Sequence, residues 1–335
     1  MVVLGIETSC DDTSLALFSS ERGIIADLTA NQLIHEKYGG VVPEIASRAH
    51  IRNLLPVFSR LMAESGITER EIEGIGVSNG PGLIGSLLVG VSFAKALAFA
   101  LDRPLVGVHH IEAHILANEL GGESLETPAI VLVVSGGHTS LYRVETVGRY
   151  ELVGNTRDDA AGEAFDKISK LLDLGFPGGP AVEKAASSGN PHAVEFPRAM
   201  LKQNNFDLSF SGLKTAVRLY VESLPALTPQ VVSDVAASAQ EAIVDVLVQK
   251  TIACAVHHRV SHVYLAGGVA ANGELRGRLS AESEKLDITY HAPLLRYCTD
   301  NGAMVACAAA RHLDMGRDDG LDLDVFARRP VTSWV

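Results

Sequence analysis

Residues 131–142 read Val131-Leu132-Val133-Val134-Ser135-Gly136-Gly137-His138-Thr139-Ser140-Leu141-Tyr142. Four apolar residues lead into a short polar turn, and apolar alternation resumes at Leu141. The stretch therefore predicts a buried strand, a tight turn and a second strand. Two adjacent glycines at the end of a strand let backbone N–H groups converge on an anion without a Cβ in the way. We expect a phosphate-binding hairpin here.

The same pattern occurs near the start of the chain, where residues 3–15 read Val3-Leu4-Gly5-Ile6-Glu7-Thr8-Ser9-Cys10-Asp11-Asp12-Thr13-Ser14-Leu15. The two stretches align without a gap, and four positions are identical: Ser9 with Ser135, Thr13 with Thr139, Ser14 with Ser140 and Leu15 with Leu141. We interpret this match as an internal duplication. It predicts two related halves that face each other across a cleft.

Composition limits the class of protein. A chain of 335 residues, 47% apolar and 20% charged, is expected to form two globular domains. The four cysteines form no C-x-x-C pair, which argues against a zinc knuckle or a disulfide framework and favours a reducing compartment. The best membrane-span candidate, residues 83–101, is interrupted by Gly85, Gly90 and Lys95, so we expect a cytoplasmic protein. A net charge of −12 argues against broad nonspecific nucleic-acid binding.

Strand patterns and helix patterns alternate along the chain. Strands are expected at 2–8, 13–18, 23–31, 72–78 and 105–108, and helices at 44–65, 83–101, 158–174 and 228–258, with a last helix that ends near Arg311. Residues 177–180 are expected to form a loop, and residues 206–215 an ordered polar and aromatic segment. The alternation predicts an α/β fold with helices on both faces of its sheets. The first half is expected to comprise residues 1–128 plus about 300–335, whose helix packs back on it, and the second half residues 129–299.

Three strand-ending turns of glycine or hydroxyl residues lie at 9–13, 135–139 and 267–272. The chain has no G-x-x-x-x-G-K-[ST] motif, which argues against a P-loop protein, and no G-x-G-x-x-G follows the first strand. A hairpin turn in each half and a late Gly-Gly loop resemble the nucleotide site of the actin, Hsp70 and sugar-kinase superfamily. The predicted fold is therefore two duplicated actin-like (RNase H-like) domains with a nucleotide cleft between them.

His110 and His114 are four residues apart at a predicted helix start, so both imidazoles point to one side of the helix. This spacing is typical of metal ligands, and ordinary cleft or surface histidines are the alternative. Asp300 is a candidate third ligand, and a His-His-Asp set suits iron or zinc. Asp166 lies deeper in an acidic helix and is a candidate for binding ribose hydroxyls, with a solvated first turn as the alternative.

The chain closely resembles the bacterial tRNA-adenosine threonylcarbamoyltransferases, the TsaD family, formerly called O-sialoglycoprotein endopeptidases or glycoproteases. The resemblance covers nearly the whole chain. It depends on motifs in one order: residues 5–13, 38–44 with 46–48, 80–83, 109–114, 134–139, 158–167, 177–180, 210–214, 267–272 and 298–304.

The resemblance implies a reaction and a set of site residues. The threonylcarbamoyl group of threonylcarbamoyl-AMP would pass to the N6 amine of adenosine 37 in tRNAs that read ANN codons, with release of AMP. His110, His114 and Asp300 would bind one divalent metal, most often Fe²⁺, with Zn²⁺ as the alternative. The adenylate would contact a set of residues in the second half: Val133, Val134, Ser135, Gly136, Gly137, Asp166, Gly179, Glu183 and Asn272. Glu183 stands where many members have aspartate, which leaves its role open.

Asp11 and Asp12 in the first turn are candidate catalytic residues, although no general base follows from the resemblance. Family members work with tRNA, with a degenerate paralogue of the same fold (TsaB-like) and with a small P-loop ATPase (TsaE-like). Two other functions compete with this one. The first is an ATP-dependent small-molecule kinase of the same superfamily. The second is a metalloprotease, whose H-E-x-x-H motif the chain lacks.

Overall fold

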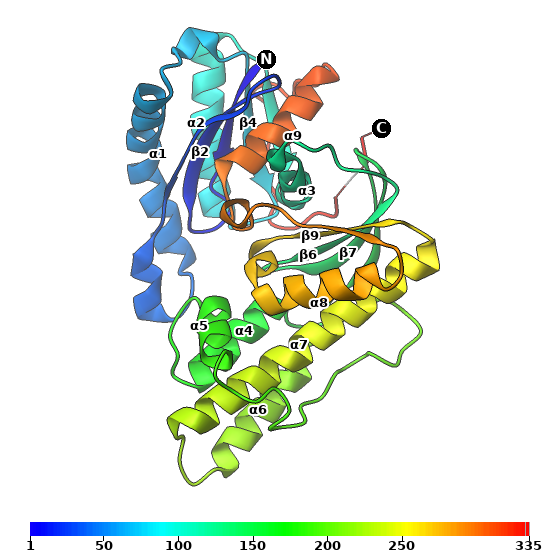
Figure 1. Cartoon of the computed structure of the whole chain (residues 1–335). Coiled ribbons are helices and arrows are strands. Elements are labelled where there is room, and N and C mark those ends of the chain that lie inside the picture. The colour runs from blue at the N-terminus through cyan, green and yellow to red at the C-terminus, as the bar shows by residue number, and fades with distance from the viewer. Residues whose placement is uncertain (332, 335) are drawn as a thin grey trace. The chain divides into compact units, whose positions relative to one another are not determined.

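A computed structural model of the protein describes residues 1–331 and 333–334 (Figure 1). The chain forms two compact units. Unit 1 contains residues 1–125 and 293–331, and unit 2 contains residues 126–292 and 333–334. The chain thus leaves unit 1 after Leu125 and returns to it at Pro293, and Ser333 and Trp334 belong to unit 2 again.

Unit 1 is built on a five-stranded sheet in the order β3-β2-β1-β4-β5. The strands are β1 (Val2–Glu7), β2 (Thr13–Ser19), β3 (Gly23–Ala30), β4 (Gly74–Gly80) and β5 (Leu105–His109). The first three form an antiparallel meander, whereas β4 and β5 run parallel to β1.

Unit 2 repeats this arrangement with β8-β7-β6-β9-β10. Its strands are β6 (Ala129–Val134), β7 (Thr139–Thr146), β8 (Arg149–Asn155), β9 (His262–Ala266) and β10 (Thr289–His291). Again three antiparallel strands are followed by two parallel ones. The identical order and directions confirm the predicted fold of two duplicated α/β halves.

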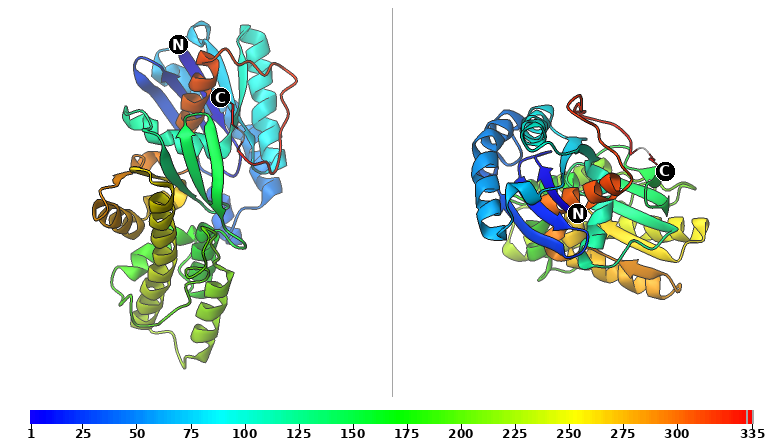
Figure 2. Two further views of the ribbon diagram at one scale, coloured as in Figure 1. Left: turned by 90° about the vertical axis from the view of Figure 1, so that its right-hand side faces the viewer. Right: turned by 90° about the horizontal axis from the view of Figure 1, so that it is seen from above.

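Strand alternation divides the sheet of unit 1 between two helical layers. Leu4 and Ile6 point into a core formed with α1 (Pro43–Ser65) and α2 (Ile84–Leu101). Gly5, between them, faces α9 (Gly302–Asp314) on the other side of the sheet. Helices therefore cover both faces of this sheet (Figure 2).

Helix α9 lies unusually close to the sheet because the strands beneath it carry glycines. Gly5 of β1 and Gly76 of β4 are neighbours in register. A Cβ on Gly5 would lie 2.2 Å from the carbonyl oxygen of Gly302, and one on Gly76 would lie 2.3 Å from the Cβ of Ala309. This close approach sets the distance between the N-terminus of α9 and β1.

Unit 2 is dominated by α7 (Pro229–His258), which Thr228 caps through a bond from the Val231 N–H, as the sequence predicts. This helix packs on β6 and β9 and on four shorter helices: α4 (Ala161–Leu171), α5 (Gly178–Ala186), α6 (Ser211–Ser223) and α8 (Gly273–Glu284). Two predictions were wrong. The expected loop at 177–180 is the start of α5, and residues 211–215 of the expected polar segment are the first turn of α6. The short 3-10 helices are Leu33–Tyr38, Glu69–Glu71, Ala117–Gly121, Gly268–Ala271 and Leu295–Tyr297.

Helix α2 confirms the helix predicted at 83–101 but corrects the expectation about its apolar run. By length and composition it is apolar enough to cross a membrane, with a mean hydropathy of 1.9 over 18 residues, although it contains Gly85, Gly90 and Lys95. One such helix is weak evidence for a membrane span, because a core helix of a soluble protein passes the same test. Here α2 packs against α1 and β4.

Candidate metal and nucleotide sites

The candidate metal site lies where the parallel strands of unit 1 end. β1 ends at Glu7 and β5 at His109, and carboxyl ends of parallel strands meet at one edge of a sheet. Helix α3 (His110–Leu116) begins directly after β5, so His110 is its first residue. Asp300 lies just before α9, and α9 can approach β1 closely because Gly5 has no side chain. Local chain direction therefore brings three distant segments to one point.

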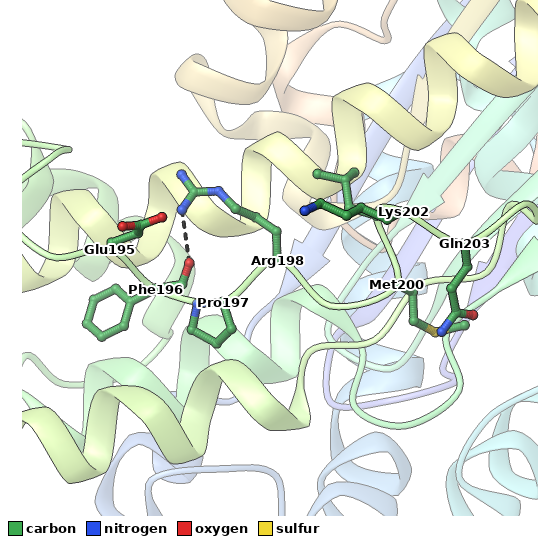
Figure 3. Close-up of a pocket in the computed structure, with 8 residues that line it drawn as sticks. Glu195, Phe196, Pro197, Arg198, Met200, Lys202 and Gln203 are labelled. Carbon is green, nitrogen blue, oxygen red and sulfur yellow. Dashed lines mark hydrogen bonds between the residues drawn. The ribbon is translucent and has the colours of Figure 1, made fainter.

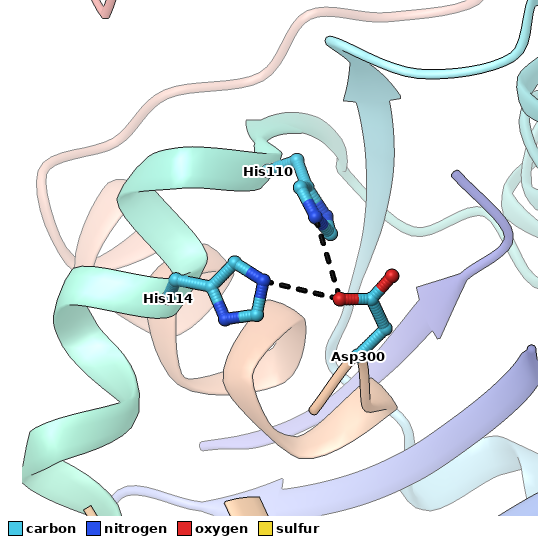
Figure 4. Close-up of side chains that lie close together, drawn as sticks. All are labelled: His110, His114 and Asp300. Atoms are coloured by element: carbon cyan, nitrogen blue, oxygen red, sulfur yellow. Dashed lines mark hydrogen bonds and ion pairs between the residues drawn. The ribbon is translucent and has the colours of Figure 1, made fainter. Parts of the chain in front are cut away.

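His110, His114 and Asp300 converge at this edge, and their ligand atoms all lie within 4.8 Å of one another (Figure 4). Oδ1 of Asp300 is 3.1 Å from Nε2 of His114 and 3.5 Å from Nε2 of His110. Ligand atoms about 2.0–2.1 Å from a tetrahedral metal are separated by roughly 3.3 Å. The spacing of these three ligand atoms fits one divalent transition metal.

Glu7 holds the ring of His110 from the other side. Its Oε2 is 3.1 Å from Nδ1 of His110, and the Ser78 hydroxyl donates a hydrogen bond to the same oxygen. The Ser9 N–H donates to Oε1 at 2.6 Å. A carboxylate that accepts the second N–H of a histidine fixes the tautomer and raises the basicity of the free nitrogen, as is usual for metal-binding histidines. Glu7 therefore prepares Nε2 of His110 to bind a metal.

The site is buried and negatively charged. Burial lowers the pKa of His110, but the carboxylates of Asp300 and Glu7 outweigh this effect and raise that pKa to about 9. Burial also works to raise the pKa of Glu7, whereas His110 and the Ser78 hydroxyl lower it below its ordinary value. The negative charge that holds a proton on His110 also attracts a cation. The donor set and its charge thus fit a divalent metal.

Glu112, between the two histidines, is engaged elsewhere. Its Oε2 lies 3.0 Å from Nε2 of His312 on α9, and both side chains are buried. In an H-E-x-x-H metalloprotease the glutamate would instead be the general base beside the metal. This pairing gives no support to a protease.

The first hairpin turn carries the candidate catalytic aspartates. Asp12 accepts a hydrogen bond of 2.8 Å from the Asn31 side chain, and burial raises its pKa to about 7. His50 of α1 braces this turn, with Nδ1 2.8 Å from the Thr13 hydroxyl and Nε2 3.0 Å from the Cys10 carbonyl oxygen. Asp11 lies next to Asp12 in the same turn. Whether either acid is catalytic stays a prediction.

The second hairpin forms the expected turn after Val133 and Val134 of β6. The Ser135 N–H donates to the His138 carbonyl oxygen at 2.8 Å, which closes the turn. A Cβ on Gly136 or Gly137 would meet open space, so these glycines leave the turn accessible from outside. The N-terminus of α4 packs against the turn through Gly162, whose N–H donates to Ser135 at 3.2 Å.

The other predicted adenylate residues form two linked pairs in unit 2. Asp166 accepts a hydrogen bond of 2.7 Å from the N–H of Gly178, which places Gly179 beside it at the start of α5. Burial raises the pKa of Asp166, and the Gly178 N–H opposes that shift.

Glu183 and Asn272 form the second pair. Oε1 of Glu183 accepts a hydrogen bond of 2.7 Å from the N–H of Gly273. Asn272 caps α8 and is almost fully buried, with its amide donating to Gln240 at 2.9 Å. The structure thus ties α4 to α5 and α5 to α8. Adenylate binding by these residues remains a prediction.

One pocket of unit 2 is lined by none of these residues. It has a volume of 620 Å³ and is lined by residues 195–198 and 200–203 (Figure 3). Arg198 spans one side of it, donating to the Phe196 carbonyl oxygen at 2.9 Å and to Asp245 at 2.9 Å. Nothing in the sequence marked this pocket.

Comparison with known proteins identifies relatives over almost the full chain. A family model described as tRNA N6-adenosine threonylcarbamoyltransferase, TsaD, matches residues 23–307. A protein of that name from Ralstonia pickettii (strain 12J) is 50% identical over 318 residues, which cover 93% of this chain and 92% of the relative. Another, from Syntrophobacter fumaroxidans (strain DSM 10017 / MPOB), is 48% identical, with 98% of this chain and 99% of the relative covered.

Solved structures share the fold at low identity. Full-length HypF in its phosphate- and nucleotide-bound form matches with a TM-score of 0.63 and 12% identity, covering 95% of this chain and 47% of HypF. Component A of (R)-2-hydroxyglutaryl-CoA dehydratase from Acidaminococcus fermentans matches with a TM-score of 0.55 and 13% identity, covering 93% of this chain and 99% of that one. At this identity the likeness concerns the fold alone.

Proposed function

The chain belongs to the tRNA N6-adenosine threonylcarbamoyltransferase family, and from this premise we propose that its donor is threonylcarbamoyl-AMP. It is an acyltransferase that modifies tRNA. In the proposed reaction the threonylcarbamoyl group passes to N6 of adenosine 37 in tRNAs that read ANN codons, and AMP leaves. The comparisons support neither the kinase nor the metalloprotease alternative.

One observation carries the chemical part of the proposal: a His-His-Asp ligand set whose first histidine is held by a buried carboxylate. We propose that these three residues bind Fe²⁺, with Zn²⁺ as the alternative, since two imidazoles and one carboxylate suit both ions. Such an ion acts as a Lewis acid that polarises an oxygen of the carbonyl or phosphoryl group. Glu7 would keep the proton of His110 on Nδ1, and hydrogen bonds from the Ser9 N–H and the Ser78 hydroxyl hold the Glu7 carboxylate in place.

Unit 2 supplies the proposed adenylate site. We expect the open turn at Ser135, Gly136 and Gly137 to donate backbone N–H groups to the phosphoryl group, because no side chain of Gly136 or Gly137 shields them. Asp166, Gly179, Glu183 and Asn272 would hold the adenosine. Hydrogen bonds between α4 and α5 and between α5 and α8 hold these residues in position within unit 2. Contacts with the adenosine and the phosphoryl group would orient threonylcarbamoyl-AMP, a mixed anhydride, for attack.

We propose two protein partners, a degenerate paralogue of the same fold and a small P-loop ATPase, in the cytoplasm. The strongest support for the paralogue is the surface of α2. Ile84, Leu88 and Phe99 are 41%, 47% and 77% exposed on a helix that is apolar enough by composition to cross a membrane. Large exposed apolar side chains on one helix are typical of a protein interface. Because the chain has a net charge of −12, we expect these partners to share in tRNA binding.

The direct test is transfer in a reconstituted reaction. The purified chain, its partners, tRNA and threonylcarbamoyl-AMP are incubated, and the tRNA nucleosides are analysed by mass spectrometry. Threonylcarbamoyl-adenosine and AMP should form in equal amounts. Treatment with chelator should abolish both, and readdition of Fe²⁺ or Zn²⁺ separately should show which ion restores them. Full transfer by metal-free protein would refute the metal proposal, and AMP release without modified adenosine would refute the reaction.

A further inference from the structure

A second group of side chains that could hold a metal ion lies in unit 2 and shares no residue with the proposed adenylate site. Glu126, His262 and His291 each offer a ligand atom, and these atoms lie within 4.8 Å of one another. Nδ1 of His262 is 3.2 Å from Nε2 of His291, which is close to the roughly 3.3 Å between ligands of a tetrahedral metal. The other nitrogen of His262, Nε2, is 3.5 Å from Oε2 of Glu126. We propose that Glu126, His262 and His291 form a second site for a divalent transition metal of the zinc type.

Three neighbouring strands, β10, β9 and β6, bring these side chains together. His262 is the first residue of β9 and pairs in register with Ala129 of β6 and Thr289 of β10. His291 ends β10, and Glu126 lies three residues before the first residue of β6. Adjacent parallel strands thus supply two ligands, and the segment that enters β6 supplies the third.

Tyr264 holds the site in shape. Its ring stacks on the imidazole of His291, with centroids 4.2 Å apart and an angle of 8° between the planes. Its hydroxyl accepts a hydrogen bond of 2.8 Å from the backbone N–H of Glu126. One tyrosine therefore orients a ligand ring and anchors the backbone of a second ligand. Such outer contacts are what preorganise a metal site.

The proposed site lies where the chain enters and leaves unit 2. Glu126 is the first residue of unit 2, and His291 stands next to Ala292, where the chain leaves it. An ion bound to both residues would link the entering and leaving segments of unit 2 to β9. We expect a structural role for this ion, separate from transfer at the His110 site.

The matching explanation without a metal is a hydrogen-bonded chain in which a protonated His262 bridges Glu126 and His291. Zinc uptake separates the two. The full chain is stripped with a chelator, dialysed against Zn²⁺ and assayed for bound zinc by mass spectrometry. Wild type should take up two zinc ions per chain. H262Q/H291Q and H110A/H114A should each take up one, and the control H192Q/H257Q, which changes two exposed histidines, should take up two.

Two further variants keep the test decisive if H262Q/H291Q does not fold. E126Q changes an exposed side chain and should lose the second zinc, and Y264F should weaken its binding by about tenfold. Zn²⁺ should also slow amide exchange in residues 126–131 and 289–291 of wild type but not of E126Q. A wild-type protein that binds a single zinc, or an E126Q protein that still binds two, would overturn the proposal. Transfer by E126Q should stay at the wild-type level, so loss of the second zinc and failure of the transfer reaction are separate results.

Discussion

Glu7 is the residue on which the ligand geometry depends most, although it touches no ligand atom of a metal. It is fully buried and connects His110 to Ser9 and Ser78. Glu7→Gln keeps the shape of the side chain and removes the charge that holds the Nδ1 proton of His110. Affinity for Zn²⁺ or Fe²⁺ at the His110 site should fall 10- to 100-fold, as measured by competition with a chelating dye. Glu73→Gln changes an exposed glutamate and is the matched control; equal affinities of the two variants would contradict this role.

Asp12 makes a pH-dependent contribution to stability. Its pKa is raised to about 7, first by burial and then by nearby carboxylates. A carboxyl group with a raised folded-state pKa stabilises the fold at low pH, and this contribution is lost as pH rises from about 4 to about 7. Asp12→Asn cannot ionise, so the melting temperature of the metal-free variant should rise relative to wild type between pH 5 and pH 8. A difference that stays constant over this range would show that Asp12 is ionised at both ends of it.

Sequence reasoning selected three residues that the structure brings together, but it missed the residues that position them. The spacing of His110 and His114 is a local signal, and Asp300 was a candidate third ligand that the family resemblance also implied. Glu7 has no such signal, since its partners Ser78 and His110 lie on other elements, β4 and α3. His50 was missed for the same reason: a single histidine in the pattern of α1 looks like any other buried position. Contacts between distant segments depend on packing, which a local pattern does not contain.

The close packing of helix α9 on the sheet positions Asp300. Gly5→Ala would place a Cβ 2.2 Å from the carbonyl oxygen of Gly302, where backbone cannot yield easily. We expect a loss of about 1–3 kcal/mol in the free energy of unfolding and weaker metal binding, because α9 must move away from β1. Gly277→Ala lies in open space on α8 and should stabilise the protein by about 0.5–1 kcal/mol. Chemical denaturation of both variants measures the difference, and an unchanged Gly5→Ala protein would contradict the packing argument.

Helices and strands with a clear hydrophobic period or a capping residue were predictable from the sequence. Helices whose first residues have the composition of a loop were not. Pro177-Gly178-Gly179-Pro180 has the composition of a loop, but Pro177 precedes the first turn of α5 and Asp166 accepts the N–H of Gly178. This tertiary hydrogen bond outweighs the low helix propensity of two glycines. The first turn of α6 is held in a similar way, since Asp158 accepts the N–H groups of Phe210 and Ser211.

For the whole molecule, the duplication seen in two short hairpins predicted two related halves, and both units have the same strand order. It did not predict the apolar surface of α2, because a helix pattern does not state which side is covered. Leu88→Glu with Phe99→Glu should leave the fold intact and abolish binding of the paralogous partner in analytical ultracentrifugation. Leu219→Glu with Leu227→Glu changes two equally exposed leucines in unit 2 and should bind normally. If the α2 variant also binds normally, the interface lies elsewhere.

The central claim is that the His110, His114 and Asp300 site makes this chain a metal-dependent threonylcarbamoyltransferase. The most direct measurement is bound metal and modified adenosine in the same reconstituted samples, for H110A/H114A and for the matched control H192A/H257A. The account predicts that H110A/H114A loses the metal of this site and all transfer, while the control keeps both. Transfer at the wild-type level by folded H110A/H114A would contradict it.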